Sequence, residues 1–294
     1  MAPSFSGMMT MKLRLKQAVS LLVLFLILSS NLSAQERNTD SLPSLWELAK
    51  YDGVSAFNGF TTTYTKPLSW EKKDFITAGA IVVGTGALFL IDEPASDWFV
   101  EQGEDIPPFI QDAAWYFGKP QYNYSLNGAI YLYGLFTRNE KVRKTGVLLI
   151  SAASAAGLLQ TISKTVTGRA RPMTGEGSAS FEPFSGEAGY HSFPSGHTIL
   201  AVTTAYAIGK QFENPYLKAG IYALGMVTPV SRLWAGAHWL SDVGLSVAIS
   251  ILMVDAIDHY LNTERDYDKQ DPSKTRITWD LQLGAGGIGI RGSF

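Results

Sequence analysis

The stretch KTVTGRARP (residues 164–172) is followed along the chain by two others of related chemical character, PSGH (194–197) and SRLWAGAHWLSD (231–242). Together they supply three fixed cations, Lys164, Arg171 and Arg232, and two histidines, His197 and His238. The transition state of phosphoryl transfer spreads negative charge over oxygens that fixed cations and backbone N–H groups stabilise. The three stretches therefore predict a site for phosphoryl transfer.

The segment PSGH precedes an apolar run, 198–208, that we predict to be a helix. The first amides of a helix lack partners, and the helix dipole favours an anion there. We therefore expect the Ser195 and Gly196 amides to face the phosphate. In the first stretch, Lys164 and Arg171 lie seven residues apart near a helix end marked by Gly168 and Pro172, so both are expected to reach one anion.

His238 precedes Asp242 by four residues. On a helix these positions share one face, so we expect the carboxylate to accept a proton from one ring nitrogen. Such a carboxylate fixes the tautomer and leaves the other nitrogen as a nucleophile. His197 then remains to act as the acid.

These residues match, position for position, the three signature motifs of the type 2 phosphatidic acid phosphatase (PAP2) family, which also contains vanadium haloperoxidases and bacterial acid phosphatases. The pattern is Lys, six residues, Arg-Pro; then Pro-Ser-Gly-His; then Ser-Arg, five residues, His, three residues, Asp. The resemblance covers roughly 69–261. It implies that His238 forms a phosphohistidine intermediate, that Asp242 orients His238, and that His197 protonates the leaving oxygen and later activates water. It also implies that the phosphate is held by Lys164, Arg171, Ser195, Gly196 and Arg232.

Taken singly, each motif has a simpler structural explanation, such as a solvated basic helix end, a turn or a helix-surface pair. Three spaced motifs in the right order favour the joint interpretation. Of the other histidines, His191 is expected to be a loop residue and His259 receives no chemical role. The chain has no cysteine, and its histidines lack the spacing of zinc helices. We therefore expect no metal and no cofactor, and activity that survives chelation.

The amino terminus resembles a secretory signal peptide, assigned to residues 1–34. Lys12, Arg14 and Lys16 precede an apolar run, 18–28, and cleavage is expected after Ala34. Leu32 is large for its place before the cut, which leaves retention as an anchor open. The chain is expected outside the cytoplasm, periplasmic or membrane-associated, with its site facing outward.

The rest of the chain divides into a lead-in (35–68), a helical phosphatase core (69–265) and a tail (266–294) with β-like alternation. The predicted fold is an all-α bundle of about six core helices. They correspond to apolar segments at 75–91, 126–136, 147–162, 198–208, 217–230 and 243–257.

Membrane topology stays open at this stage. Most apolar segments fall short of the roughly 20 residues of a membrane span, and the mean hydropathy of +0.05 is intermediate. Counting three spans from a cleaved start places the first motif on the cytoplasmic side. The cluster Lys141, Arg143 and Lys144 predicts the opposite, because cytoplasmic loops carry excess positive charge. We favour membrane association.

The leading functional hypothesis is a metal-independent phosphatase for a lipid phosphate or pyrophosphate, such as phosphatidic acid, an isoprenyl pyrophosphate or a lipid A phosphate. The alternatives are a non-specific acid phosphatase, a vanadate-dependent haloperoxidase and a non-catalytic binding protein. A net charge of −2 gives no indication of a nucleic-acid partner. The expected partner is a phosphorylated lipid or a small phosphate ester, selected by the loop 173–193.

Overall fold

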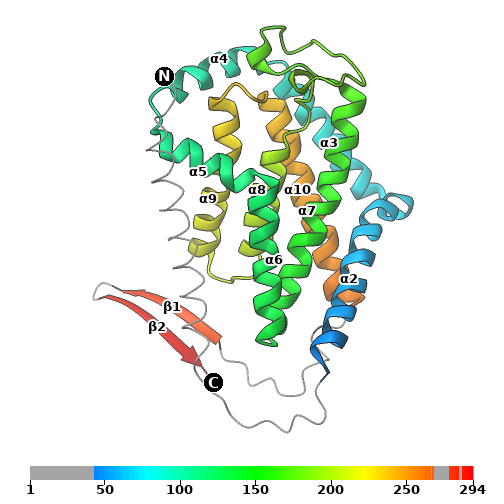
Figure 1. Cartoon of the computed structure of the whole chain (residues 1–294), viewed down its shortest axis with the longest axis vertical. Helices are drawn as coiled ribbons and strands as arrows, with labels where there is room; N and C mark the ends of the chain where they lie inside the picture. Colours follow the sequence, from blue (N-terminus) through cyan, green and yellow to red (C-terminus); the bar gives the residue numbers. More distant parts are fainter. Residues whose placement is uncertain (1–42, 266, 268–277, 285–286, 294) are drawn as a thin grey trace. The chain divides into compact units, whose positions relative to one another are not determined.

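The computed structural model describes residues 43–265, 267, 278–284 and 287–293 (Figure 1). The predicted signal peptide, 1–34, lies outside these residues. Within them the α-helices are α2 (Leu45–Thr65), α3 (Lys72–Phe89), α4 (Asp92–Gly103), α5 (Pro108–Gly118), α6 (Pro120–Phe136), α7 (Glu140–Thr167), α8 (Gly196–Gly209), α9 (Pro215–Trp234) and α10 (Leu240–Thr263). Three short 3₁₀ helices are η2 (Lys66–Ser69), η3 (Pro172–Thr174) and η4 (Ala188–Tyr190). The core is all-α, as predicted.

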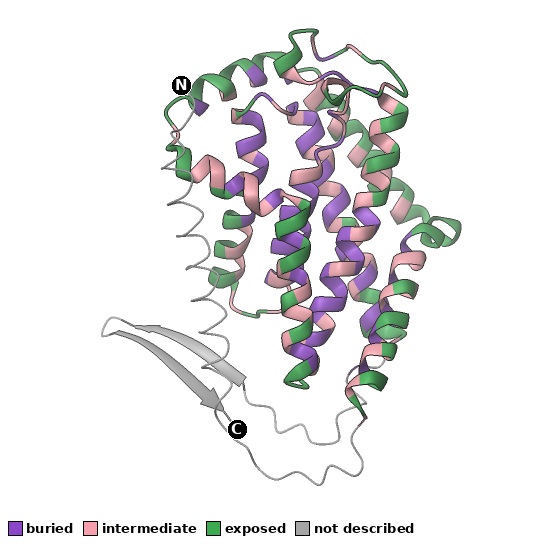
Figure 2. Ribbon diagram, in the orientation of Figure 1, coloured by how far each residue is buried: buried purple, intermediate pink, exposed green. Residues whose placement is uncertain are grey.

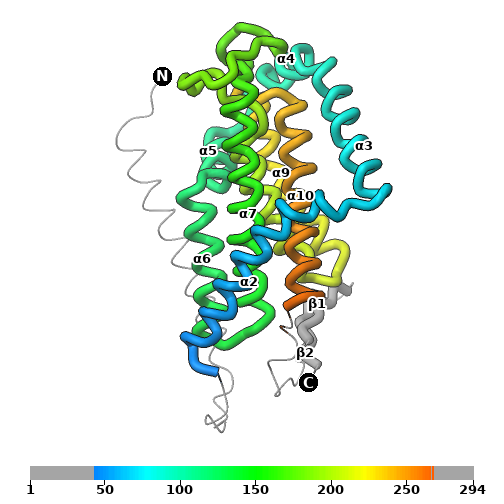
Figure 3. The backbone as a smooth tube through the Cα atoms, turned by 90° about the vertical axis from the view of Figure 1, so that its right-hand side faces the viewer, coloured from blue at the N-terminus to red at the C-terminus, as the bar shows by residue number. Residues whose placement is uncertain are grey.

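The centre of the bundle is formed by α7, α8 and α10, which contact one another and carry most of the buried residues (Figure 2). Around them, α6 packs on α7, α9 packs on α8, and α5 packs on both α8 and α9. On another side, α2 lies across the lower parts of α7 and α10, and α3 packs on α10 (Figure 3). Several loops between helices lie at the end of the bundle near α4 and α5. The predicted site residues are in these loops and in the adjoining helix ends.

Helix α7 shows how local sequence sets an element of this core. Its start is capped by Asn139, whose side chain accepts a hydrogen bond from the Val142 amide at 3.1 Å. Its end is set by Gly168, which adopts φ +55°, and an added Cβ there would meet the Glu182 carbonyl oxygen at 1.7 Å. Between these ends the helix buries a row of small and branched apolar side chains: Val147, Leu148, Leu149, Ala152, Ala155 and Ala156. Burying each of the larger ones contributes about 1.5–3 kcal/mol, and the alanines allow neighbouring helices to approach closely.

The six apolar segments predicted from the sequence overlap α3 and α6 to α10. The pattern did not include α2, α4 or α5 among the predicted core helices. Helix α4 is mostly charged or polar on its outer face, and its buried residues are Asp92, Ser96 and Gly103. A search for apolar runs misses such a helix because its buried face is polar or small.

The end of the bundle away from the predicted site residues is held by a buried ion pair. Arg143 Nε at the start of α7 lies 2.9 Å from Asp52 Oδ2 on α2, and both side chains are almost fully buried. The hydroxyls of Tyr131 and Tyr267 donate to the same carboxylate at 3.2 and 3.1 Å. This cluster fastens α2 and the residues after α10 to the core.

Two helices of the described chain, α7 and α10, are long and apolar enough to cross a membrane, and the bent pair α3 and α4 passes the same test jointly. In the tail, β1 (Thr278–Gly284) and β2 (Gly287–Ser293) form an antiparallel hairpin in which Thr278 pairs with Ser293 and Gly284 with Gly287. The alternation in the tail predicted strand structure there.

Candidate active site

A cavity of about 700 Å³ opens at the end of the bundle near α4 and α5. Six of the eight predicted site residues line it: Lys164, Arg171, Gly196, His197, Arg232 and His238. They come from the end of α7, the loop after it, the start of α8, the end of α9 and the loop before α10. The other two, Ser195 and Asp242, are fully buried and are not among the residues that line the cavity.

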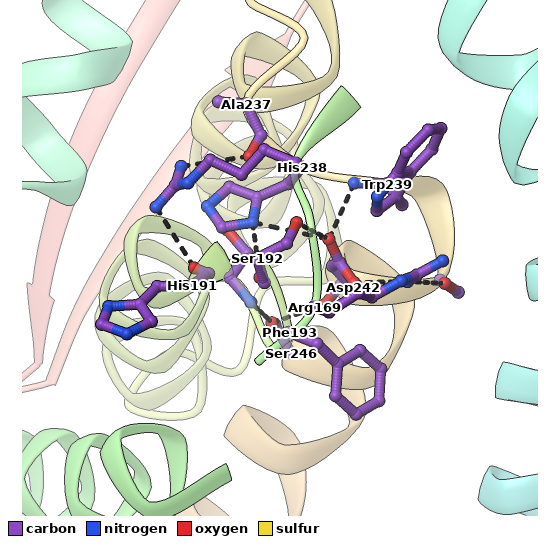
Figure 4. Close-up of polar contacts among 12 residues, drawn as sticks. Arg169, His191, Ser192, Phe193, Ala237, His238, Trp239, Asp242 and Ser246 are labelled. Atoms are coloured by element: carbon purple, nitrogen blue, oxygen red, sulfur yellow. Dashed lines mark hydrogen bonds and ion pairs between the residues drawn. The ribbon is translucent and has the colours of Figure 1, made fainter. Parts of the chain in front are cut away.

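His238 lies in the loop before α10, so it does not share a helix with Asp242 as the spacing had led us to expect. Its Nδ1 is 2.7 Å from the Ser192 carbonyl oxygen and 3.6 Å from Asp242 Oδ2 (Figure 4). A carbonyl can only accept, so Nδ1 carries the proton and Nε2 keeps its lone pair. The backbone carbonyl of Ser192, rather than the carboxylate, is the close partner that selects this tautomer.

Asp242 lies behind His238 in the first turn of α10. Its Oδ2 accepts hydrogen bonds from the Trp239 amide at 2.8 Å and from the Ser192 hydroxyl at 2.5 Å. Its Oδ1 accepts from Arg169 Nη1 at 2.6 Å. The carboxylate therefore caps its own helix and orders the two segments that carry His238 and Ser192.

The cations of the cavity wall are held by oxygen acceptors. Lys164 Nζ donates to the His191 carbonyl at 2.7 Å. Arg171 donates to the Ala188, Ala237 and His191 carbonyls at 2.9, 3.1 and 3.2 Å. Arg232 donates to the Ser231 hydroxyl at 3.1 and 3.2 Å. Since none of these acceptors is ionised, the positive charge of all three side chains remains available to an anion.

The turn at the start of α8 differs in part from expectation. Ser195 is the N-cap, and its hydroxyl accepts from the Thr198 amide at 3.4 Å. Its own amide, expected to face the phosphate, donates to Ser246 Oγ at 2.7 Å. Gly196 lines the cavity as the first residue of α8, where helix amides have no partner within the helix. Ser195 thus shapes the turn, while Gly196 remains placed to donate to an anion.

His197 packs against α5. Its ring stacks on that of Trp115 with an angle of 29° between the ring planes and 6.2 Å between the centroids. Gly118 lies so close that an added Cβ would meet His197 Cβ at 2.8 Å. Within the described chain, His197 Nε2 is buried and has no hydrogen-bond partner. This nitrogen is therefore uncommitted in a cavity lined by cations.

The electrostatics of the cavity keep both rings neutral near pH 7. Burial, opposed by Asp242 and aided by Lys164 and Arg171, lowers the pKa of His238 to about 4. Burial also lowers the pKa of His197 to about 3, aided by Arg232 and the other cations. A phosphate dianion bound among these cations would raise both pKa values, and thereby favour protonation of His197 in the complex.

The remaining histidines lie away from the chemistry. His191 Nε2 is 2.9 Å from the Ser185 carbonyl oxygen, and only its backbone carbonyl serves the site. His259 is an exposed residue of α10. No group of three or more histidine, aspartate or glutamate side chains that could hold a metal ion occurs among the described residues.

Sequence reasoning missed four residues around the site: Trp115, Arg169, Ser192, and Asp92, whose Oδ2 accepts a hydrogen bond from Arg169 Nη2 at 2.7 Å. Arg169 lies inside the first motif but was not singled out, although an arginine two residues before Arg171 was a visible signal. Ser192 acts on His238 through its backbone, and Asp92 and Trp115 lie far from the motifs in sequence. No sequence signal pointed to these three.

Comparison with known proteins finds a family and several proteins that this chain resembles. Residues 145–266 match the PAP2 superfamily model. A lipid A 1-phosphatase from Rhizobium etli is 32% identical over 195 residues, 60% of this chain and 78% of that protein. Another from Rhizobium johnstonii is 29% identical over 211 residues, 65% of this chain and 81% of that protein. The solved structure of a transmembrane PAP2 type phosphatidylglycerolphosphate phosphatase from Bacillus subtilis is 23% identical, with a TM-score of 0.45 over 76% of this chain and 100% of that chain.

The family match and the two lipid A 1-phosphatase relatives define the class of this protein as a phosphoric ester hydrolase. Within that class, the chain belongs to the PAP2 superfamily.

Proposed function

We propose that this protein is a membrane-associated, metal-independent phosphatase that removes a phosphate from a lipid phosphate of the lipid A 1-phosphate kind. The sequence relatives named lipid A 1-phosphatases support that substrate class. The observation that carries the proposal is an apolar groove that adjoins the cavity of the six motif residues. The same site could also act on lipid pyrophosphates. Their leaving group is a phosphate instead of an alcohol, but the phosphoryl group that binds among the cations is the same.

In the proposed reaction, the Nε2 lone pair of His238 attacks phosphorus while Nδ1–H stays hydrogen-bonded to the Ser192 carbonyl. The bond between phosphorus and the ester oxygen breaks, and His197 Nε2–H donates its proton to that oxygen. A water then attacks the phosphohistidine as His197 takes one of its protons. The P–N bond breaks, inorganic phosphate leaves, and both histidines return to their starting states.

The cations supply the stabilisation that this path requires. Lys164, Arg171 and Arg232 line the cavity, and the Gly196 amide adds a helix N-terminus. Charge accumulates on the equatorial phosphate oxygens in the transition state, so fixed donors aimed there lower the barrier. No step needs a divalent ion.

The groove is a second cavity, of about 460 Å³, between α6, α7 and α8. It shares Gly196 and His197 with the phosphate cavity. Its walls combine the aliphatic side chains Leu158, Ile199 and Leu200 with the polar ones of Tyr124, Ser154, Gln160 and Thr161, and most of its surface is apolar. Because His197 protonates the leaving oxygen, the leaving group must lie on the side of His197, where the groove begins. An apolar channel there suits a hydrocarbon chain better than a small soluble alcohol.

The variant Gly157→Leu tests this assignment. Gly157 lines the groove, and a Cβ added there meets nothing within 4 Å, so a side chain can begin there and is expected to occupy part of the groove. Displacing two or three methylenes of substrate at about 0.8 kcal/mol each predicts a loss of kcat/KM for a long-chain lipid phosphate of roughly 15- to 60-fold. A soluble aryl phosphate should be cleaved as by the parent.

The matched control is Gly220→Leu on α9, where an added Cβ also meets nothing within 4 Å and which is not among the groove residues. It should leave both substrates unaffected. An equal loss of both activities in Gly157→Leu, or no loss of either, would remove the groove from the account.

We also propose that the site faces away from the cytoplasm. The helix α4 and the turn after it, near the site, carry the exposed acidic residues Glu93, Asp97, Glu101, Glu104 and Asp105. The turn between α6 and α7 and the first turns of α7 lie at the far end. They carry Arg138, Lys141 and Lys144, beside Glu140 and the buried, ion-paired Arg143. Cytoplasmic loops carry the excess of lysine and arginine, which supports an outward site.

Since the chain has no cysteine, single cysteines report its orientation directly. A membrane-impermeant maleimide applied to spheroplasts should label Glu101→Cys at once, and Lys141→Cys only after detergent is added. The reverse pattern would place the site in the cytoplasm, and immediate labelling of both would mean that the chain does not span.

A further inference from the structure

The side chain that holds Asp242 is Arg169, in the loop after α7. It is 1% exposed, and all three of its guanidinium nitrogens are used. Nη1 donates to Asp242 Oδ1 at 2.6 Å and to Ser241 Oγ at 2.8 Å, while Nε donates to the Ser178 carbonyl at 3.0 Å. The rings of Phe89, Trp239, Phe181 and Phe193 lie 4.8–5.9 Å from the guanidinium carbon. Arg169 is therefore fixed in a largely apolar shell.

A second carboxylate completes the group. Arg169 Nη2 donates to Asp92 Oδ2 at 2.7 Å, and Asp92 is fully buried at the start of α4. Asp92 also accepts from the Ser241 amide at 2.8 Å and from the Ser241 hydroxyl at 2.5 Å. One guanidinium thus lies between two ionised acceptors, and the three side chains together carry one net negative charge.

This group reaches the nucleophile by two routes. Asp242, held on Oδ1 by Arg169, directs Oδ2 toward His238 Nδ1 at 3.6 Å and toward the Ser192 hydroxyl. The Arg169 backbone carbonyl accepts from the Ser192 amide at 3.0 Å, and the Ser192 carbonyl accepts from His238 Nδ1 at 2.7 Å (Figure 4). Side chain and backbone of Arg169 therefore both fix the segment that sets the His238 tautomer.

We propose that Asp92 and Arg169 are positioning residues for the phosphatase reaction, acting on His238 through Asp242 and Ser192. This inference rests on the phosphohistidine mechanism proposed above. Asp92 shares the charge of Arg169, so that Asp242 keeps enough negative charge to support the cationic ring formed when His238 attacks phosphorus. Helix α4, outside residues 145–266 that match the family model, is thereby part of the active site.

Removing the charge of Asp92 and removing that of Arg169 should move the pH of His238 protonation in opposite directions. The charged and titratable groups around His238 are Asp242 from α10, Lys164 from α7, Arg171 from the following loop and His197 from α8. Asp92→Asn removes a negative charge from the group behind Asp242, so His238 should protonate at lower pH. Arg169→Gln removes a positive charge, so His238 should protonate at higher pH. Both should lower kcat about 10- to 100-fold, the range measured for outer partners that orient metal-bound histidines.

The matched control within the group is Ser241→Ala. It deletes the hydroxyl that bridges Asp92 and Arg169, and therefore disturbs the same packing. It leaves the charges of both residues in place. Its His238 should protonate at the same pH as in the parent. A control at the other end of the bundle is Asp52→Asn, which removes a buried carboxylate from Arg143, about 31 Å along α7 from Lys164. It should alter stability and leave the pH of His238 protonation unchanged.

The measurement is an NMR titration of ¹⁵N-histidine-labelled, detergent-solubilised full chain, with a His238→Gln spectrum to assign the ring. The acid limb of kcat for an aryl phosphate is recorded in parallel. The pH at which His238 protonates should fall in Asp92→Asn, rise in Arg169→Gln and stay at the parental value in Ser241→Ala. Displacement in one common direction, or an Asp92→Asn titration and kcat equal to those of Ser241→Ala, would overturn the proposal.

If Asp92→Asn does not fold, Arg169→Gln decides alone, and protonation of its His238 at the parental pH or below refutes the inference. Failure of the proposed function is distinguishable, because the parent itself would then release no phosphate. An active parent with an unaffected Asp92→Asn variant refutes only the role of Asp92 and Arg169.

Discussion

Replacing Gly118 by alanine tests whether the position of His197 limits the reaction. Gly118 ends α5 where this helix meets α8, and the new Cβ would lie 2.8 Å from His197 Cβ, 2.9 Å from His197 Cδ2 and 2.8 Å from Thr228 Cγ2. Carbon atoms in ordinary contact lie at 3.4 Å or more. The new Cβ and the His197 side chain must therefore separate by about 0.6 Å, the difference between 2.8 and 3.4 Å, and we expect much of that shift to fall on His197 because Thr228 blocks α5 on its other contact.

The expected effect follows from that displacement. A misplacement of about 1 Å costs roughly 100-fold in rate, so a shift of half that size predicts a fall in kcat of about tenfold. Overpacking at the contact costs about 1–3 kcal/mol, and the helix preference of alanine over glycine returns up to about 1 kcal/mol. The chain should therefore fold, with KM for an aryl phosphate nearly unchanged because the cations are not displaced.

The assay is steady-state hydrolysis of an aryl phosphate by the purified full chain, with Gly220→Ala as the control. An added Cβ at Gly220 meets nothing within 4 Å, so its kcat should equal that of the parent. A Gly118→Ala variant with parental kcat would show that His197 tolerates this displacement. In that case its assignment as the proton donor in a fixed geometry would be wrong.

Three further predictions concern pH, the far end of the bundle and metals. In the parent, the His238 ring should stay neutral down to about pH 4 in a ¹⁵N NMR titration, because burial lowers its pKa; half-protonation between pH 6 and 7 would contradict this. Since the unfolded chain binds that proton near pH 6.5, the free energy of unfolding should fall as pH drops from about 6.5 to 4, which acid titration of thermal unfolding checks. Asp52→Ala should destabilise the chain by about 3–5 kcal/mol in denaturant melts, because Arg143 is left buried without its carboxylate, and a loss under 1 kcal/mol would refute a structural role for the pair. Excess chelator should leave kcat within twofold of its starting value, whereas loss of activity that Mg²⁺ or Zn²⁺ restores would mean that the cations in the site do not suffice.

The fold could be predicted from apolar runs as far as such runs occur. Helices α3 and α6 to α10 contain them. Gly168 marked the end of α7 correctly, because its left-handed conformation favours glycine and the nearby Glu182 carbonyl leaves no room for a Cβ. Helix α4 could not be found in this way, since its buried residues Asp92 and Ser96 are polar. Their burial depends on partners distant in sequence, which a local pattern does not contain.

The site could be predicted to the extent that its chemistry lies in side chains at fixed spacing. Lys164, Arg171, Gly196, His197, Arg232 and His238 line one cavity because separate helix ends meet there. The predicted contact of His238 with Asp242 is longer than a hydrogen bond, because the close acceptor of His238 Nδ1 is the backbone carbonyl of Ser192. Backbone acceptors carry no residue identity, so sequence alone could not assign this one.

The central claim is that His238 acts as a nucleophile on a lipid phosphate. Its most direct test is phosphate release in excess chelator from detergent-dispersed lipid A 1-phosphate, phosphatidic acid and an isoprenyl pyrophosphate, beside an aryl phosphate, by the parent and by His238→Ala. The account predicts release from at least one lipid by the parent, complete loss in His238→Ala, and a base-stable, acid-labile phosphoprotein trapped only in the parent. Lipid phosphate release that persists in His238→Ala, or release from the aryl phosphate alone, would contradict it.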